Sequence, residues 1–207
     1  MEKTTTPTTV YAEMTPNPAT MKYVANRYLV DKEGVIAEYR TPQDAKGSSP
    51  LAEALFNFPF VKAVFITANF VTVTKDDSIN WDLINMELRE FVRNFLENNE
   101  KAVTKLPELS YGAEENKQGE KKRIVEPQIK SGLDRKIVSL LDEYVKPAVE
   151  SDGGAIDFKS FSDGVVTVVL RGACSGCPSS TVTLKNGIEN LLKQHVPQVT
   201  EVVAEEM

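Results

Sequence analysis

The sequence predicts an α+β protein of two small domains, each built from layers of helices and strands, joined by a flexible linker. Three observations lead to this prediction. The chain has 207 residues, a length that suits one large domain or two small ones. A polar stretch at 104–130, with several prolines and glycines and a run of charges, shows no sustained apolar periodicity. The regions on either side of it, 9–103 and 131–205, both contain helix-type and strand-type patterns.

The first region begins with a turn and contains strands rich in β-branched and aromatic residues. Thr15–Pro18 carries two prolines, which suit neither a helix nor an inner strand, so a rigid turn is expected there. Strands are predicted at Met21–Val24, Val61–Ile66 and Phe70–Thr74.

Two helices are predicted in the same region. A short one covers Ser49–Phe56, with Ser49 as the N-cap and Pro50 at the first helical position. A long one covers Trp81–Asn98, because its large apolar residues recur at helical spacing and form one buried stripe. The stripe consists of Ile84, Leu88, Phe91, Val92 and Phe95.

The second region gives the order α-β-β-α-β, a small sheet with two helices on one side. A helix is expected over Leu133–Val149, with Pro147 kinking or ending it. A turn at Asp152–Gly154 and a hairpin turn at Asp163-Gly164 bracket the first two strands. The remaining elements are strands at 155–161, 165–170 and 199–203 and a helix at 179–195.

Composition and charge exclude several classes of partner. The formal net charge is -6 and the isoelectric point about 5.0, which disfavours phosphate backbones and anionic membrane surfaces. No apolar run approaches the ~20 residues of a membrane span. The first ten residues are Thr-rich, with neither an apolar core nor arginine, so no targeting peptide is recognised. We therefore expect a cytoplasmic protein without nucleic-acid or membrane partners, or a processed organellar one.

The chain has two cysteines, Cys174 and Cys177, in one C-x-x-C motif. Such a pair is more typical of metal binding or thiol reactivity than of a disulfide framework. The motif joins a strand end to a helix start, and Pro178 suits the first helical position, so Cys177 falls near the N-cap. The positive end of the helix dipole would lower the pKa of Cys177. Gly172 and Gly176 would let the backbone approach a bulky ligand.

One copy of this motif supplies two thiolates, whereas a structural zinc site or an all-cysteine cluster takes four. The single histidine, His195, lies about five helical turns away and is expected to face water at a helix C-terminus. A two-fold dimer in which each subunit gives one C-x-x-C is the simplest way to reach four ligands. A group held there would be exposed and removable, as in a carrier.

Other interpretations of the motif stay open at this point. A thiol–disulfide oxidoreductase uses C-x-x-C at a helix start, although here the proline follows the second cysteine and the surrounding element order differs. A dimeric zinc-binding interaction module would use the same four thiolates. Arg171 either adds positive charge near the thiols or is a solvated strand-end residue. A histidine general base near the motif, a phosphate-binding loop and a dinucleotide fingerprint are missing, so no enzyme is predicted.

The framed motif resembles a known family. The run 147–154 (PAVESDGG) and the run 172–189 (GACSGCPSSTVTLKNGIE) closely resemble the NifU-like C-terminal domain. The segments Thr15–Pro18, Ser49–Ala52 and Phe70–Lys75 resemble the Nfu N-terminal domain, although Ala19 stands where a polar residue is expected.

The resemblance implies a scaffold or carrier rather than an enzyme. It would accept a transient [4Fe–4S] cluster from upstream cluster assembly proteins, bind it through Cys174 and Cys177 shared between two subunits, and deliver it to apo iron–sulfur proteins. The first region has no cysteine and would assist recognition of donors or targets. The predicted domains are thus 9–103 (Nfu N-terminal-like), 104–130 (linker) and 131–205 (NifU-like, cluster-binding).

Overall fold

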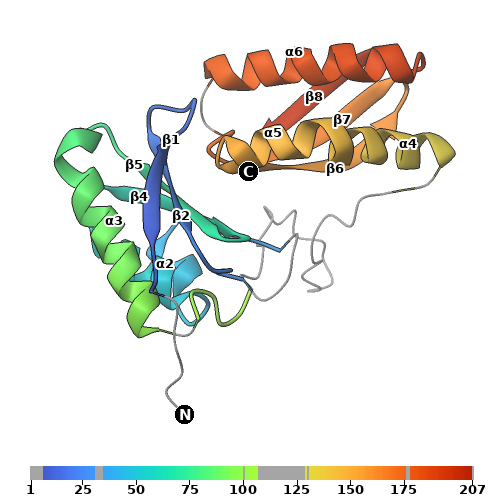
Figure 1. The fold of residues 1–207 in the computed structure, drawn as a ribbon. Helices are drawn as coiled ribbons and strands as arrows, with labels where there is room; N and C mark the ends of the chain where they lie inside the picture. The colour runs from blue at the N-terminus through green and yellow to red at the C-terminus, as the bar shows by residue number, and fades with distance from the viewer. Residues whose placement is uncertain are drawn as a thin grey trace, which may run out of the picture. The chain divides into compact units, whose positions relative to one another are not determined.

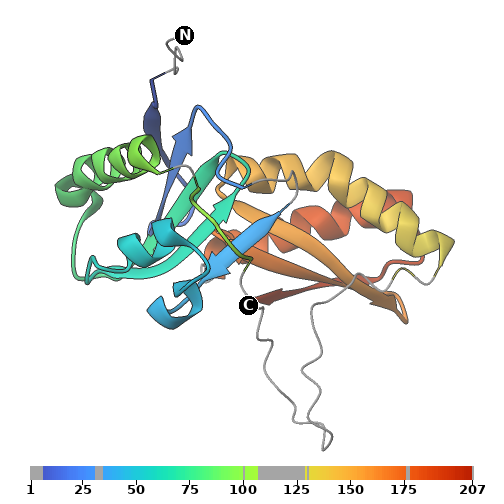
Figure 2. The ribbon, with the colours of Figure 1, turned by 90° about the horizontal axis from the view of Figure 1, so that it is seen from below.

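The computed structural model of the protein describes residues 7–30, 35–99, 101–106, 129, 131–175 and 178–206 (Figures 1 and 2). The chain forms two compact units. The first unit contains Met1–Pro107 together with two short loop segments, Asp152–Gly154 and Gly172–Cys174. The second unit contains the rest of the chain, and each unit is described by itself. Most of the predicted linker at 104–130 lies outside the described residues.

A five-stranded antiparallel sheet is the frame of the first unit. Its strand order is β1-β2-β5-β4-β3, which leaves β1 and β3 at the edges. The strands are β1 (Val10–Met14), β2 (Thr20–Ala25), β3 (Ile36–Tyr39), β4 (Val61–Thr67) and β5 (Phe70–Lys75). The three predicted strands are confirmed as β2, β4 and β5, while β1 and β3 are additional.

The described residues of this unit form three helices: α1 (Pro42–Ala45), α2 (Pro50–Leu55) and α3 (Trp81–Asn98). The predicted N-cap of α2 is confirmed, because the Ser49 hydroxyl accepts a hydrogen bond from the Ala52 amide at 3.0 Å. The same hydroxyl donates to the Ala102 carbonyl at 2.7 Å, which ties the chain after α3 to α2. Helix α1 has a capping box from Thr41 and Asp44 that the sequence analysis did not use.

The core of the first unit lies between one face of the sheet and the helices α2 and α3. Ile84, Leu88 and Val92 of the predicted stripe are buried, and Leu96 extends it. Phe91 and Phe95 pack against the core while partly exposed. Alternate sheet residues face this core, such as Tyr23 and Val71, both 0% exposed.

The second unit begins with a helix that changes its winding part-way. It runs as α4 (Gly132–Leu140), a π-helical turn η1 (Leu141–Val145) and α5 (Lys146–Ser151). Pro147 was predicted to kink or end the helix; it does not end it, because the helix continues to Ser151, and the π-helical turn lies just before it. A proline inside a helix removes one hydrogen bond and crowds the carbonyl four residues earlier, and the wider π turn before Pro147 relieves that crowding.

Three strands complete this part of the chain, in the order β6-β7-β8. They are β6 (Gly154–Ser162), β7 (Val165–Gly172) and β8 (Glu201–Glu206), with α6 (Pro178–His195) between the last two. The hairpin turn is confirmed: Asp163 and Gly164 have φ of 50° and 82°, the positive values that a tight two-residue turn requires.

Strand β8 pairs in parallel with β7 and starts two residues later than predicted. The shift arises because Val199 still belongs to a turn, in which its amide donates to the Val196 carbonyl at 2.9 Å. The predicted order α-β-β-α-β is confirmed, and so is the α+β class of both units. Among the described residues, none of the helices is both long enough and apolar enough to cross a bilayer.

Candidate functional site

The first cysteine of the motif lies in the loop that connects β7 to α6. Cys174 follows Gly172, the last residue of β7. Cys177, the second predicted site residue, lies outside the described residues, as do the side chains of 176–180. The structure therefore gives the surroundings of Cys174 and the start of α6 at Pro178. We call Gly172–Cys174 the cysteine loop and Asp152–Gly154 the glycine turn.

Glycine is required at the start of the cysteine loop. Gly172 has φ of 62°, the left-handed region that L side chains rarely adopt. A Cβ atom there would lie 2.9 Å from the Gly153 carbonyl oxygen and 3.1 Å from the Gly154 Cα. The Ala173 amide also donates to the Gly153 carbonyl at 3.3 Å. The glycine expected to admit a ligand thus first allows the cysteine loop and the glycine turn to pack together.

The thiol of Cys174 is shielded. Its residue is 7% exposed. This burial, with a smaller contribution from the negative charge of Asp152, raises the pKa of the Cys174 thiol to about 12. The thiol form therefore dominates at neutral pH in this arrangement. A helix N-terminus was expected to favour the thiolate at Cys177, so the surroundings of Cys174 act in the opposite direction.

Two polar side chains from the first unit's sheet region hold these loops through their backbones. Asn17 Nδ2 donates to the Ala173 carbonyl at 3.1 Å, and Thr72 Oγ1 donates to the Gly153 carbonyl at 2.8 Å. Both donors are buried, at 5% and 1% exposure. Neither was predicted as a site residue. Both lie in segments that resemble the Nfu N-terminal domain, Thr15–Pro18 and Phe70–Lys75, and this resemblance is the sequence signal that could have pointed to them.

Arg171 and His195, the other residues considered from the sequence, each contact a neighbouring side chain. Arg171 is 6% exposed and pairs with Asp157 on the neighbouring strand β6 at 3.3 Å, so it is not a solvated strand-end residue. His195 is exposed at the C-terminus of α6, as predicted, and stacks on Tyr144 with ring centroids 6.4 Å apart. Within the part of the chain that the structure describes, no three His, Cys, Asp or Glu side chains gather as a metal site.

Comparisons with known proteins cover both regions. The family "Scaffold protein Nfu/NifU N terminal" matches residues 10–99, and the family "NifU-like domain" matches residues 137–203. The human protein named "NFU1 iron-sulfur cluster scaffold homolog, mitochondrial" is 34% identical over 195 residues, which are 93% of this chain and 70% of the human one. The chain belongs to the Nfu/NifU family of iron–sulfur cluster scaffold proteins. This is a family of scaffold proteins rather than of enzymes.

Another relative matches this chain over a similar length. The Drosophila erecta protein of the same name is 37% identical over 194 residues, 93% of this chain and 63% of that protein. The chain thus spans about two thirds of these relatives. A solution structure of a NifU-like protein from Saccharomyces cerevisiae is similar with a TM-score of 0.43 and 21% identity, covering 51% of this chain and 92% of that one.

Proposed function

We propose that this Nfu-type scaffold binds a labile [4Fe–4S] cluster as cargo through Cys174 and Cys177 of two subunits and transfers it to apo-proteins. One observation carries the proposal. The chain has two cysteines, both in one C-x-x-C, and this motif lies inside the region that matches the NifU-like domain. Thiolates are the usual ligands of iron–sulfur clusters, so the donor set fits the cargo in kind.

The ligand count supports a homodimer as the loaded form. A [4Fe–4S] cluster held by protein thiolates takes four of them, and one chain has two. Two chains related by a two-fold axis supply four from equivalent positions. The cluster then lies at an interface, and separation of the subunits or attack by a competing thiol releases it. These properties suit transfer better than permanent storage.

The burial of Cys174 supports a scaffold that binds its cluster only after the cysteine loop has moved. Iron binds the thiolate, so loading must remove the proton that burial keeps on Cys174. Burial also leaves the Cys174 residue only 7% exposed, which disfavours its sharing a ligand with a partner subunit in this arrangement. Loading therefore needs the cysteine loop to open, and the cluster-free protein gains protection from oxidation or stray metals while the loop is closed.

The two alternatives fit the surroundings of Cys174 less well. A thiol–disulfide oxidoreductase attacks with an accessible thiolate of lowered pKa, whereas Cys174 is buried and its pKa is raised. A zinc-binding interaction module would use the same four thiolates, so the ligand count does not separate it from the cluster carrier. Family membership favours the cluster.

The partners follow from the role. We propose upstream cluster assembly proteins as donors and apo iron–sulfur proteins as acceptors, with nucleic acid and membranes having no part. The cytoplasmic location expected from the sequence stays a prediction, and the relatives named above are described as mitochondrial. Fractionation of the source cell, with this chain followed by antibody, tests the location.

Anaerobic reconstitution with iron and sulfide tests the proposed function. The wild-type protein should acquire the broad visible absorbance of cysteine-bound iron–sulfur clusters, and Cys174→Ala and Cys177→Ala should each lose it. Ser175→Ala is a matched control inside the motif that leaves both thiols in place. If either cysteine variant binds as much iron as the wild-type protein, the assignment of ligands is wrong.

A further inference from the structure

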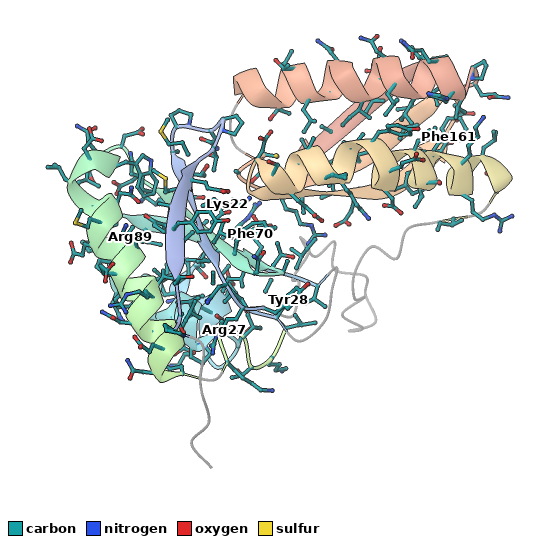
Figure 3. All side chains as sticks on the ribbon, in the orientation of Figure 1. Lys22, Arg27, Tyr28, Phe70, Arg89 and Phe161 are labelled. Atoms are coloured by element: carbon teal, nitrogen blue, oxygen red, sulfur yellow. The ribbon has the colours of Figure 1, made fainter. Side chains whose placement is uncertain are left out.

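The sheet of the first unit has a second face that its own helices do not use. Residues alternate along β5, so Val71 and Val73 enter the core while Phe70 and Thr72 face the opposite way. Lys22 on β2 and Phe65 on β4 are the direct cross-strand neighbours of Thr72. Lys22 lies over the Phe70 ring, with Nζ 4.6 Å from its centroid (Figure 3). We call Lys22, Phe65, Phe70 and Thr72 the polar–aromatic face.

This face is buried although it carries a lysine and a threonine. Phe65 is 2% exposed, Phe70 5%, Thr72 1% and Lys22 8%. Buried polar groups need partners, because an unpaired donor costs about 1–3 kcal/mol. Lys22 pairs with Glu13 on β1 at 3.0 Å, and the Thr72 hydroxyl donates to the Gly153 carbonyl. The lysine is therefore paired within the sheet, and the threonine is paired by the glycine turn.

The cysteine loop and the glycine turn each pack against this face through a glycine. A Cβ at Gly172 would lie 3.0 Å from Cγ of Phe65, and a Cβ at Gly153 would lie 3.0 Å from Thr72 Oγ1. These positions therefore leave no room for a side chain. Asn17 adds a second anchor, with its Nδ2 on the Ala173 carbonyl while its Oδ1 accepts from the Ala19 amide at 3.0 Å. The prolines of Thr15–Pro18 stiffen the turn that carries this anchor.

We propose that Asn17 and Thr72 are positioning residues for the cysteine loop: Asn17 holds the Ala173 carbonyl of that loop, and Thr72 holds the Gly153 carbonyl of the glycine turn on which the loop packs. Together the two contacts keep Cys174 buried in the cluster-free protein, and they must be released before Cys174 can bind iron. The inference rests on the proposed function for what release achieves. The shielding of Cys174 concerns the cluster-free chain and does not depend on that function. These two hydrogen bonds go to the backbone carbonyls of Ala173 and Gly153, so substituting Asn17 or Thr72 leaves both cysteines in the chain.

The free energy of the two hydrogen bonds is small enough for the cysteine loop to open reversibly. One hydrogen bond contributes a net free energy that corresponds to roughly two- to tenfold in an equilibrium. Two such bonds and the glycine contacts keep the loop closed most of the time, yet a partner that binds the open loop can overcome them. Removing one bond should therefore raise the open population, and the thiol's labelling rate with it, by roughly two- to tenfold.

Alkylation of the cluster-free full chain tests this proposal. In a Cys177→Ser background the one remaining thiol is Cys174, and its reaction with iodoacetamide at fixed pH is followed by intact mass. Thr72→Val removes the hydroxyl at almost constant shape, and Asn17→Asp keeps the Oδ1 that accepts from Ala19 while losing the Nδ2 donor. Each should accelerate labelling two- to tenfold, and the double variant should label at least as fast as the faster single variant.

Two further variants separate positioning from general loosening. Thr72→Ser keeps the hydroxyl and should label at close to the wild-type rate. Thr74→Val makes the same chemical change two residues further along β5 and should leave the rate unchanged. Wild-type rates in both Thr72→Val and Asn17→Asp, with folding verified by circular dichroism, would overturn the proposal. Equal acceleration in Thr74→Val would overturn it as well, because the effect would then not belong to the hold.

The experiment distinguishes this proposal from the proposed function. Labelling needs no iron, so a negative result removes the hold and leaves cluster binding to be decided by reconstitution. If instead the variants label faster but the wild-type protein never binds a cluster, the hold stands as a shield of the thiol and the proposed cargo is wrong.

Discussion

Gly172→Ala should destabilise the protein strongly, whereas Gly187→Ala should stabilise it. The two substitutions add the same methyl group in different surroundings. Gly172 has φ of 62° and backbone atoms within 3.1 Å of the new Cβ position. Gly187 lies on the exposed side of α6 with nothing within 4 Å. Each variant is therefore a matched control for the other.

The magnitudes follow from three terms. A non-glycine residue in the left-handed region costs about 1–2 kcal/mol. The 2.9 Å approach to the Gly153 carbonyl forces the backbone to move, and overpacking of this kind costs typically 1–3 kcal/mol. Alanine returns about 0.4–1 kcal/mol by restricting the unfolded chain. Gly172→Ala should thus cost about 2–4 kcal/mol, while Gly187→Ala should gain about 0.5–1 kcal/mol from helix propensity.

Differential scanning calorimetry measures both effects. For a domain of this size 1 kcal/mol shifts Tm by about 4–8 °C, so Gly172→Ala should lower the Tm of the affected transition by more than 8 °C. Gly187→Ala should raise its Tm by a few degrees. If Gly172→Ala unfolds at the wild-type temperature while Gly187→Ala behaves as expected, the packing of the cysteine loop on the glycine turn is not what the structure describes.

Three further predictions concern the core, a cap and the thiol. Leu88→Ala should lower the free energy of unfolding of the first unit by about 2–5 kcal/mol, measured by urea unfolding with the single tryptophan, Trp81, as the probe, whereas exposed Leu83→Ala should be near neutral. Ser49→Ala should cost about 1–3 kcal/mol by the same measurement, since it removes the α2 cap and the bond to Ala102. In Cys177→Ser, alkylation of Cys174 should keep accelerating above pH 10. The raised pKa means that the closed arrangement keeps the thiol protonated below that pKa, and this stabilisation of the closed arrangement is lost as the pH rises toward it. A plateau near the usual cysteine pKa of about 8.5 would show an unshielded thiol.

Most of the fold followed from pattern, and the missing pieces have identifiable causes. The stripe of α3, the Ser49 cap and the Asp163-Gly164 turn are local signals, and all three are confirmed. The edge strands β1 and β3 and the four-residue helix α1 were missed because each is short. A four- or five-residue strand offers too few positions for alternation to be distinguished from chance.

The sequence predicts the chemistry of the candidate site but not its surroundings. The C-x-x-C motif marks Cys174 as a candidate ligand, because ligand chemistry depends on residue type. The anchors could not be found in that way, since Asn17 and Ala173 are 156 residues apart and sequence spacing does not show that they meet in the fold. The raised pKa of Cys174 was missed for the same reason: burial depends on tertiary packing, which local pattern does not reveal.

The most direct test of the central claim is native mass spectrometry of the anaerobically reconstituted protein, with iron and sulfide counted on the same sample. The reconstituted protein should hold one cluster of four irons and four sulfides per two chains, carried by a dimer that dissociates when the cluster is chelated. A cluster on single chains, or a dimer that holds zinc and takes up no iron, would contradict the claim that two subunits share a [4Fe–4S] cluster through Cys174 and Cys177.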